Sequence, residues 1–139
     1  MSPADTPRNR LTLRLGLAAE IEKVVPHQWT IAAYDPALPA VLSTPAMIGL
    51  MEIAAANAVA AELPPHAITV GTRIEVDHLK PVPAGATVRA TARLVKHEGR
   101  FLVFEVEAYS GEHVIGRGRV FRAIVESIQF STKANERVM

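Results

Sequence analysis

The sequence predicts an α+β fold in which one antiparallel β-sheet wraps around a long central α-helix. The segment 43–61 is mostly apolar and holds a single charged residue, Glu52, which is the pattern of a buried helix. Beyond Pro65, apolar and polar residues alternate in about four long segments, as in strands with one buried face. The 139 residues fit one domain over 1–139, with about 1–10 and 131–139 expected to be loosely ordered.

The first half of the chain is expected to supply one strand, an irregular segment and the helix. Residues 12–25 are mostly compatible with a β-strand, and residues 26–43 contain three prolines that indicate short turns. Thr44 then begins the helix, because threonine is a good N-cap and Pro45 suits the first helical position. We expect the helix to extend to about Glu62, just before two consecutive prolines.

The second half of the chain is expected to form antiparallel strands joined by short turns. Turns are expected at 81–85, 97–100 and 110–113, and the last strand at 114–128. The first of these strands should pack one face on the helix, made of Val70, Thr72, Ile74, Val76 and His78.

One sheet wrapped around one helix is the architecture of the hotdog fold. A single such unit leaves a sheet edge and much of its helix uncovered. We therefore expect a homodimer, or a higher oligomer built from it.

Composition excludes several classes of function. The net charge is +1 and the basic residues are scattered, so we expect no nucleic-acid partner. The absence of cysteine excludes disulfides, thiolate catalysis and cysteine-zinc sites, and no cluster has metal-ligand spacing, so neither a metal nor a cofactor is expected. No signal peptide is recognisable and the run 45–61 is too short to span a membrane. A cytoplasmic protein without membrane contact is therefore expected.

Glu52 is the most informative residue of the chain. A carboxylate in an apolar helix must be paired, protonated or locally exposed, and such charges often mark active sites. His78 lies on the strand face that is expected to meet the helix, and an imidazolium beside Glu52 would support the ionised carboxylate. Two structural interpretations stay open. His78 could be a core histidine bonded to a backbone carbonyl, and Glu52 could pair with an arginine of another subunit.

Thr44 and Gly71 each have a structural and a functional interpretation. Thr44 is expected to cap the helix, which leaves its hydroxyl proton free to donate. It cannot touch Glu52 in a straight helix, because eight residues rise roughly 12 Å. Gly71 interrupts a strand and indicates either a bulge or a point where a ligand approaches the backbone. The glycines at 116 and 118 are expected to bend a strand, since no strand-turn-helix context for nucleotide binding surrounds them.

Two segments carry a resemblance to a known family. Residues 42–52, Leu-Ser-Thr-Pro-Ala-Met-Ile-Gly-Leu-Met-Glu, and residues 70–78, Val-Gly-Thr-Arg-Ile-Glu-Val-Asp-His, resemble the fluoroacetyl-CoA thioesterase branch of the hotdog thioesterases. The resemblance extends over about 14–128 and includes Gly-Arg-Gly at 116–118 and Arg-Ala-Ile-Val at 122–125. The combined spacing of threonine, glutamate and histidine makes it fairly specific.

This resemblance implies hydrolysis of an acyl-CoA thioester at a dimer interface, with CoA present as part of the substrate. The catalytic threonine, glutamate and histidine of the family correspond to Thr44, Glu52 and His78. The glycine that approaches the acyl group corresponds to Gly71, and Arg122 lies in the matching C-terminal segment.

The chain departs from the family near Leu38. The fluoroacetyl specialist carries a phenylalanine gate there, so the resemblance implies the fold and the hydrolase class but not fluoroacetyl selectivity. Leu38 is expected to bind substrate together with Gly71 and Arg122. With the small side chains at 54–56, it favours a short or medium acyl chain.

The expected chemistry is attack on a thioester carbonyl. Ionised Glu52 acts either as the nucleophile, through a transient anhydride, or as the general base on a water. The Thr44 hydroxyl and a backbone N–H, such as that of Gly71, would hold the oxyanion, while His78 orients the water or Glu52. Two other functions stay open: a non-catalytic acyl-CoA binding protein, and a hotdog enoyl-CoA hydratase. The hydratase is less favoured, because it needs an aspartate and a histidine close together in a loop-helix motif. Asp77 and His78 are expected on one strand, where neighbouring side chains face opposite ways.

Overall fold

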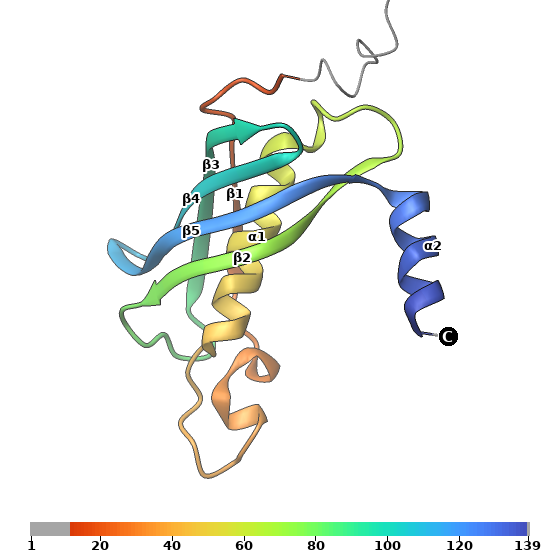
Figure 1. Cartoon of the computed structure of the whole chain (residues 1–139). Coiled ribbons are helices and arrows are strands. Elements are labelled where there is room, and N and C mark those ends of the chain that lie inside the picture. Colours follow the sequence, from red (N-terminus) through yellow and green to blue (C-terminus); the bar gives the residue numbers. More distant parts are fainter. Residues whose placement is uncertain (1–11, 139) are drawn as a thin grey trace, which may run out of the picture.

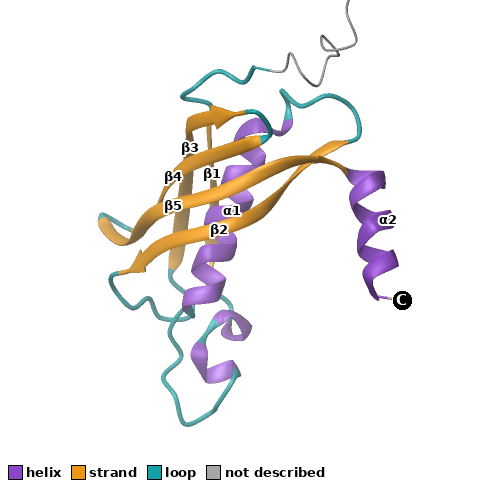
Figure 2. Ribbon diagram, viewed as in Figure 1, coloured by secondary structure: helices purple, strands orange, loops and turns teal. Residues whose placement is uncertain are grey.

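The structure, a computed structural model, describes residues 12–138 (Figures 1 and 2). The expectation for residues 1–10 therefore lies outside the described residues. In chain order the elements are β1 (Ala18–Val24), the short 3-10 helices η2 (His27–Trp29) and η3 (Ile31–Ala33), α1 (Thr44–Ala60), β2 (Ala67–His78), β3 (Thr87–Glu98), β4 (Phe101–Ser110), β5 (His113–Glu126) and α2 (Ser127–Val138).

The five strands form one antiparallel sheet in the order β1-β3-β4-β5-β2, with α1 lying across one face (Figure 1). The core lies between them, where Met47 and Met51 of α1 meet Phe104 and Val88 of the sheet. The expected helix and strand arrangement is thus confirmed. Strand β2 occupies an edge, and the sheet gives its outer side no neighbour within the described residues.

The N-terminal end of α1 differs from the sequence-based expectation by one residue. Ser43 is the N-cap, and its Oγ accepts a hydrogen bond from the backbone N–H of Ala46 at 3.2 Å. Thr44 is the first helical residue and Pro45 the second, where a missing N–H costs nothing. The prediction that Thr44 caps the helix was wrong, because serine is at least as good a cap and stands one position earlier.

A bulge in β2 changes which residues face the helix. The register with β5 shifts between Gly71, which pairs with Arg122, and Arg73, which pairs with Phe121. Directly paired residues share a face, so Gly71 lies on the same face as Ile74, whose partner Val120 is in the core. The expected face was correct from Ile74 to His78. Before the bulge it was wrong, because the extra residue puts Thr69 and Gly71 on the inner face in place of Val70 and Thr72.

The last strand and the C-terminal segment also differ from expectation. β5 ends at Glu126 rather than 128, and a second helix, α2, follows where a loose tail was expected. Figure 2 shows α2 extending away from the sheet and α1. Gly116 within β5 has a packing role. A Cβ there would lie 2.5 Å from the sulfur of Met47, so glycine lets α1 approach the sheet.

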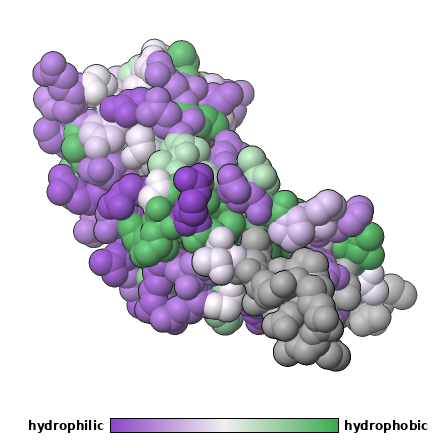
Figure 3. All heavy atoms as spheres, turned by 90° about the horizontal axis from the view of Figure 1, so that it is seen from above, coloured by the Kyte–Doolittle hydropathy of each residue, from purple (hydrophilic) through white to green (hydrophobic). Residues whose placement is uncertain are grey.

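The segment before α1 is irregular, as expected, and holds η2 and η3. The first strand is shorter than 12–25, because Gly16 adopts a φ of +95° in a turn just before it. Seen from above, the surface is mainly hydrophilic, with apolar residues in small groups between the polar ones (Figure 3).

Candidate active site

Thr44 and His78 form the first polar cluster of the inner layer. Thr44 begins α1 and His78 ends β2, and Thr44 Oγ1 lies 2.8 Å from His78 Nδ1. Because Ser43 supplies the helix cap, the Thr44 hydroxyl is available to the imidazole ring. The candidate hydroxyl and the candidate histidine are therefore already in contact.

The second ring nitrogen of His78 has no partner in the described part of the chain. Nε2 is buried and makes no hydrogen bond, although Nδ1 is bonded to Thr44. A buried polar atom without a partner costs free energy, so such an atom normally meets a ligand, a water or another chain. The interpretation of His78 as a core histidine bonded to a backbone carbonyl does not fit this geometry.

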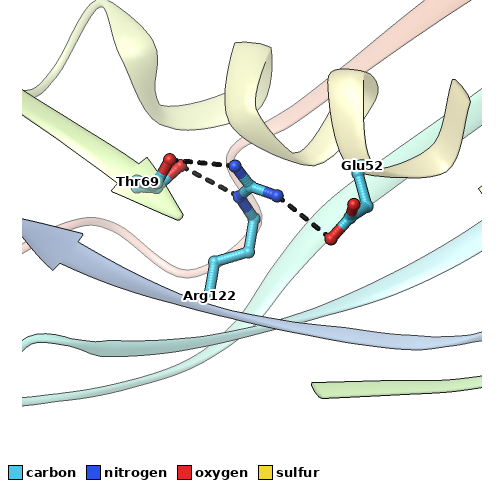
Figure 4. Close-up of polar contacts among 3 residues, drawn as sticks. All are labelled: Glu52, Thr69 and Arg122. Carbon is cyan, nitrogen blue, oxygen red and sulfur yellow. Dashed lines mark hydrogen bonds and ion pairs between the residues drawn. The ribbon is translucent and has the colours of Figure 1, made fainter. Parts of the chain in front are cut away.

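Glu52 belongs to a second cluster, in which its partner is Arg122 (Figure 4). Glu52 Oε1 accepts a hydrogen bond from one terminal nitrogen of Arg122 at 3.3 Å. Arg122 in turn donates to the side-chain and backbone oxygens of Thr69, at 3.0 and 2.9 Å. Burial lowers the pKa of Arg122 from its usual value, and the charge of Glu52 partly offsets this effect.

Gly71 provides the space in which the Glu52 carboxylate lies. A Cβ at this position would overlap Oε1 of Glu52, so any other residue would displace the carboxylate. Both interpretations of this glycine apply, because it lies at the bulge and is also a point of close approach. The group that approaches it within the chain is Glu52.

The structure thus divides the expected catalytic residues into two clusters. Thr44 and His78 meet at one end of α1, while Glu52 lies beside Gly71 and Arg122 two helical turns along. Eight residues of helix separate Thr44 and Glu52 by roughly 12 Å along the axis. The pairing of Glu52 with His78 expected from the sequence is not formed within one chain. The open alternative, an arginine partner, is observed, but the arginine comes from the same chain.

A cavity of about 300 Å³ lies beside the first cluster. Thr44 and His78 contribute to its wall. The rest of the wall is apolar except for one lysine, and consists of Ile31, Val41, Leu42, Leu79, Lys80 and Pro81. Leu38 is not part of this wall and is 43 % exposed in the loop before α1.

Sequence reasoning missed the pairing partner of Glu52. Arg122 was connected to the site only by resemblance, yet it is a lone charge in the apolar run 120–125, as Glu52 is in its helix. That shared signal could have paired the two. Thr69 gave no comparable signal, because its position on the inner face depends on the bulge.

The geometry disfavours a hydratase-type pair of acid and histidine. Asp77 pairs with Arg117 and His78 with Gly116, so the two residues lie on opposite faces and cannot act together as a hydratase pair. Among residues 12–138, no group of three histidine or acidic side chains could hold a metal ion. Within the same residues, no helix is long and apolar enough to cross a membrane.

Comparison with known proteins defines the class. The model of the family described as fluoroacetyl-CoA-specific thioesterase matches residues 25–128. A fluoroacetyl-CoA thioesterase from Streptantibioticus cattleyicolor is 36% identical over 115 residues, which is 83% of each protein. The fold, with α1 against one antiparallel sheet, is the hotdog fold of the thioesterases, and the prediction of that fold is confirmed.

Solved structures of related proteins support the same family assignment. A structure of a mutant of the fluoroacetyl-CoA-specific thioesterase, in complex with fluoroacetate and CoA, is 36% identical with a TM-score of 0.78, covering 85% of this chain and 99% of that one. A thioesterase superfamily member from Thermus thermophilus is 29% identical with a TM-score of 0.81, covering 91% of this chain and 96% of that one. The chain belongs to the fluoroacetyl-CoA-specific thioesterase family and is a thioester hydrolase.

Proposed function

We propose that this hydrolase is a homodimeric acyl-CoA thioesterase whose active site is shared between subunits. Thr44 and His78 come from one subunit, and the carboxylate is Glu52 of the partner subunit. One observation carries the proposal: His78 Nδ1 is bonded to Thr44, whereas the buried Nε2 has no partner in the described chain. The acyl-CoA substrate is supported by the relatives, one of which was solved with fluoroacetate and CoA.

The free edge of β2 and one side of α1 support the dimer. β2 ends the sheet, and an unpaired strand edge is a template for another chain. Ile53 on α1 is 46 % exposed, next to Glu52, and Ile74 on β2 is 37 % exposed although it lies on the inner face. A second subunit along this edge would cover both isoleucines and would bring its own Glu52 near the first cluster.

The shared site satisfies the groups that a single chain leaves open. Oε1 of Glu52 is bonded to Arg122, and a carboxylate has a second oxygen that can accept from another donor. With both ring nitrogens protonated, His78 would donate to Thr44 Oγ1 through Nδ1 and to Glu52 of the partner subunit through Nε2. The Thr44 hydroxyl proton is then free to donate to the thioester oxygen.

In the proposed reaction the ionised Glu52 acts on the thioester carbonyl. It either attacks the carbonyl and forms an anhydride, or removes a proton from a water that attacks. In both routes negative charge develops on the carbonyl oxygen, where the Thr44 hydroxyl and the backbone N–H of Gly71 stabilise it. CoA leaves as a thiolate. Arg122 and Gly71 lie beside Glu52 and so line the acyl end of the substrate. A substrate contact of Leu38 rests on the family resemblance alone.

Released thiol from a panel of short and medium acyl-CoA esters tests this function. The chain has no cysteine, so the protein contributes no thiol background. Wild-type protein should release CoA, and Glu52→Gln should abolish release while the protein stays folded and dimeric. A Glu52→Gln variant with wild-type turnover would refute the catalytic assignment.

Single turnover in ¹⁸O-labelled water separates the two routes. In the general-base route the label enters only the released acid. In the nucleophilic route, water that attacks the Glu52 side of the anhydride leaves label in the protein. Label in Glu52, located by mass spectrometry of the peptide that contains it, therefore contradicts the general-base route.

A further inference from the structure

A second cavity adjoins the one beside the Thr44–His78 cluster, and the two share Lys80. It has a volume of about 250 Å³, and the residues around it include Lys80, Pro81, Ser110 and His113. Lys80 and Pro81 also belong to the wall of the first cavity, so the two cavities are neighbours that share this wall. Lys80 is therefore within reach of both cavities.

The second cavity presents the positive charge of Lys80, which no carboxylate neutralises within the described part of the chain. Lys80 Nζ lies 3.5 Å from His113 Nδ1 and is the donor, since an ammonium group has no acceptor. Neither residue forms an ion pair with any carboxylate whose side chain the structure describes. By contrast, Arg89, Arg93 and Lys96 of the same sheet each pair with a glutamate.

The backbone fixes Lys80 beside His113. The N–H groups of Leu79 and Lys80 both donate to the carbonyl of Ile115, at 2.7 and 3.3 Å. His113 begins β5 two residues earlier, so the side chains of Lys80 and His113 both project from anchored segments. The Ser110 hydroxyl donates to the carbonyl of Thr87 at 3.1 Å, so its proton is already committed. Lys80 and His113 are thus the donors that remain for an anionic ligand.

We propose that Lys80, assisted by His113, binds a phosphate group of the CoA moiety and so recognises the substrate at the end opposite its acyl group. The inference rests on the proposed function, in which the acyl group points toward Glu52 and Gly71 of the partner subunit. The CoA end then leaves the first cavity on the side of Lys80. Phosphate is the anionic chemistry that CoA carries and that a lysine binds as a point charge.

Binding of free CoA tests the proposal without requiring turnover. Lys80→Ala should weaken CoA binding about tenfold, as expected for one charge-assisted contact, while Lys80→Arg retains most of the affinity. Pantetheine, which lacks the phosphates, should bind wild type and Lys80→Ala equally. 3′-Dephospho-CoA identifies which phosphate is bound. If its affinity no longer depends on Lys80, Lys80 binds the 3′-phosphate. If its affinity still falls in Lys80→Ala, Lys80 binds the pyrophosphate.

A matched control is Lys23→Ala, which removes the same charge from β1 at the opposite edge of the sheet. It should leave CoA binding unchanged. The proposal is overturned if Lys80→Ala does not weaken CoA binding, or weakens pantetheine equally. Because no hydrolysis is measured, Lys80-dependent CoA binding by a protein without thioesterase activity would refute the proposed function and leave this subsite standing.

The terminal carboxylate of a dicarboxylic acyl group is the other possible anion. We expect Lys80→Ala to raise KM about tenfold for a simple short acyl-CoA and for a CoA monoester of a short dicarboxylic acid alike, with kcat within about twofold. A KM increase confined to the dicarboxylic substrate would assign Lys80 to the acyl group and overturn the CoA assignment.

Discussion

Thr44 Oγ1 lies 2.8 Å from His78 Nδ1, although 34 residues separate the two along the chain. The contact joins the first residue of α1 to the last residue of β2. It is possible because capping is done by Ser43, one residue earlier, so the threonine hydroxyl need not serve the helix. Two adjacent hydroxyl residues thus have separate roles, one structural and one available for chemistry.

Substitutions at 43 and 44 should therefore have opposite effects. Thr44→Ala removes an oxyanion donor and should lower kcat by about 10²–10³-fold with little change in stability, whereas Thr44→Ser should keep most of the activity. Ser43→Ala should lower the free energy of unfolding by about 1 kcal/mol and leave kcat largely intact. Steady-state kinetics and denaturant unfolding measure both. If the two variants exchange these effects, the division of roles is wrong.

Alanine substitutions at Gly71 and Gly116 should likewise separate an effect on catalysis from an effect on stability. Gly71→Ala puts a methyl group where Oε1 of Glu52 lies, so we expect a folded protein with kcat/KM reduced about 100-fold. Gly116→Ala meets the flexible end of Met47 instead and should cost about 1–3 kcal/mol of stability with a smaller effect on catalysis. Kinetics and thermal unfolding of the pair check this, and a fully active Gly71→Ala variant would contradict it.

Arg122 positions Glu52 through a fork that a lysine cannot reproduce. Its guanidinium bridges Thr69 and Glu52, so Arg122→Lys should lower stability by about 1–2 kcal/mol and kcat about tenfold. Arg93→Lys is the matched control, because the exposed Arg93–Glu105 pair should contribute within about 0.5 kcal/mol. Equal effects at 93 and 122 in urea unfolding would show that burial of Arg122 is unimportant.

Charge introduced at the proposed interface should separate the subunits. Ile53→Glu places a carboxylate on the exposed side of α1, where a partner would otherwise cover an apolar side chain. We expect a folded monomer without thioesterase activity in light scattering and kinetic assays. Leu15→Glu, at a residue that is 64 % exposed and precedes β1, should remain dimeric and active. A dimeric Ile53→Glu protein would require another interface.

The long-range arrangement could be predicted from the sequence because it follows from periodicity. The apolar run around Glu52 indicated the buried helix, and alternation after Pro65 indicated the strands. The inner face of β2 was predicted correctly only after Gly71, because one inserted residue reverses the facing of all residues before it. A glycine marks where a bulge can form, but no local signal says how many residues it adds.

The two clusters were less accessible to sequence reasoning. Glu52 and His78 were each recognised as polar groups in apolar surroundings. The partner of His78 is set by tertiary geometry, so Thr44 could not be assigned to it from the residues alone, whereas Arg122 shares the lone-charge signal of Glu52 and could have been paired with it. The helix start was misplaced because Ser43 and Thr44 are both suitable caps. The helix α2 was missed because its sequence is polar and helical propensity alone is weak.

Complementation between inactive variants tests the shared site most directly. When Thr44→Ala and Glu52→Ala proteins are unfolded together and refolded, each heterodimer should contain one intact site, and random exchange should restore about a quarter of wild-type activity. A mixture of Thr44→Ala and His78→Ala should stay inactive, because both residues come from the same subunit. Recovery in the first mixture alone is the result we predict. No recovery in the first mixture, with heterodimers confirmed by mass spectrometry, would contradict a site that uses Glu52 of the partner subunit.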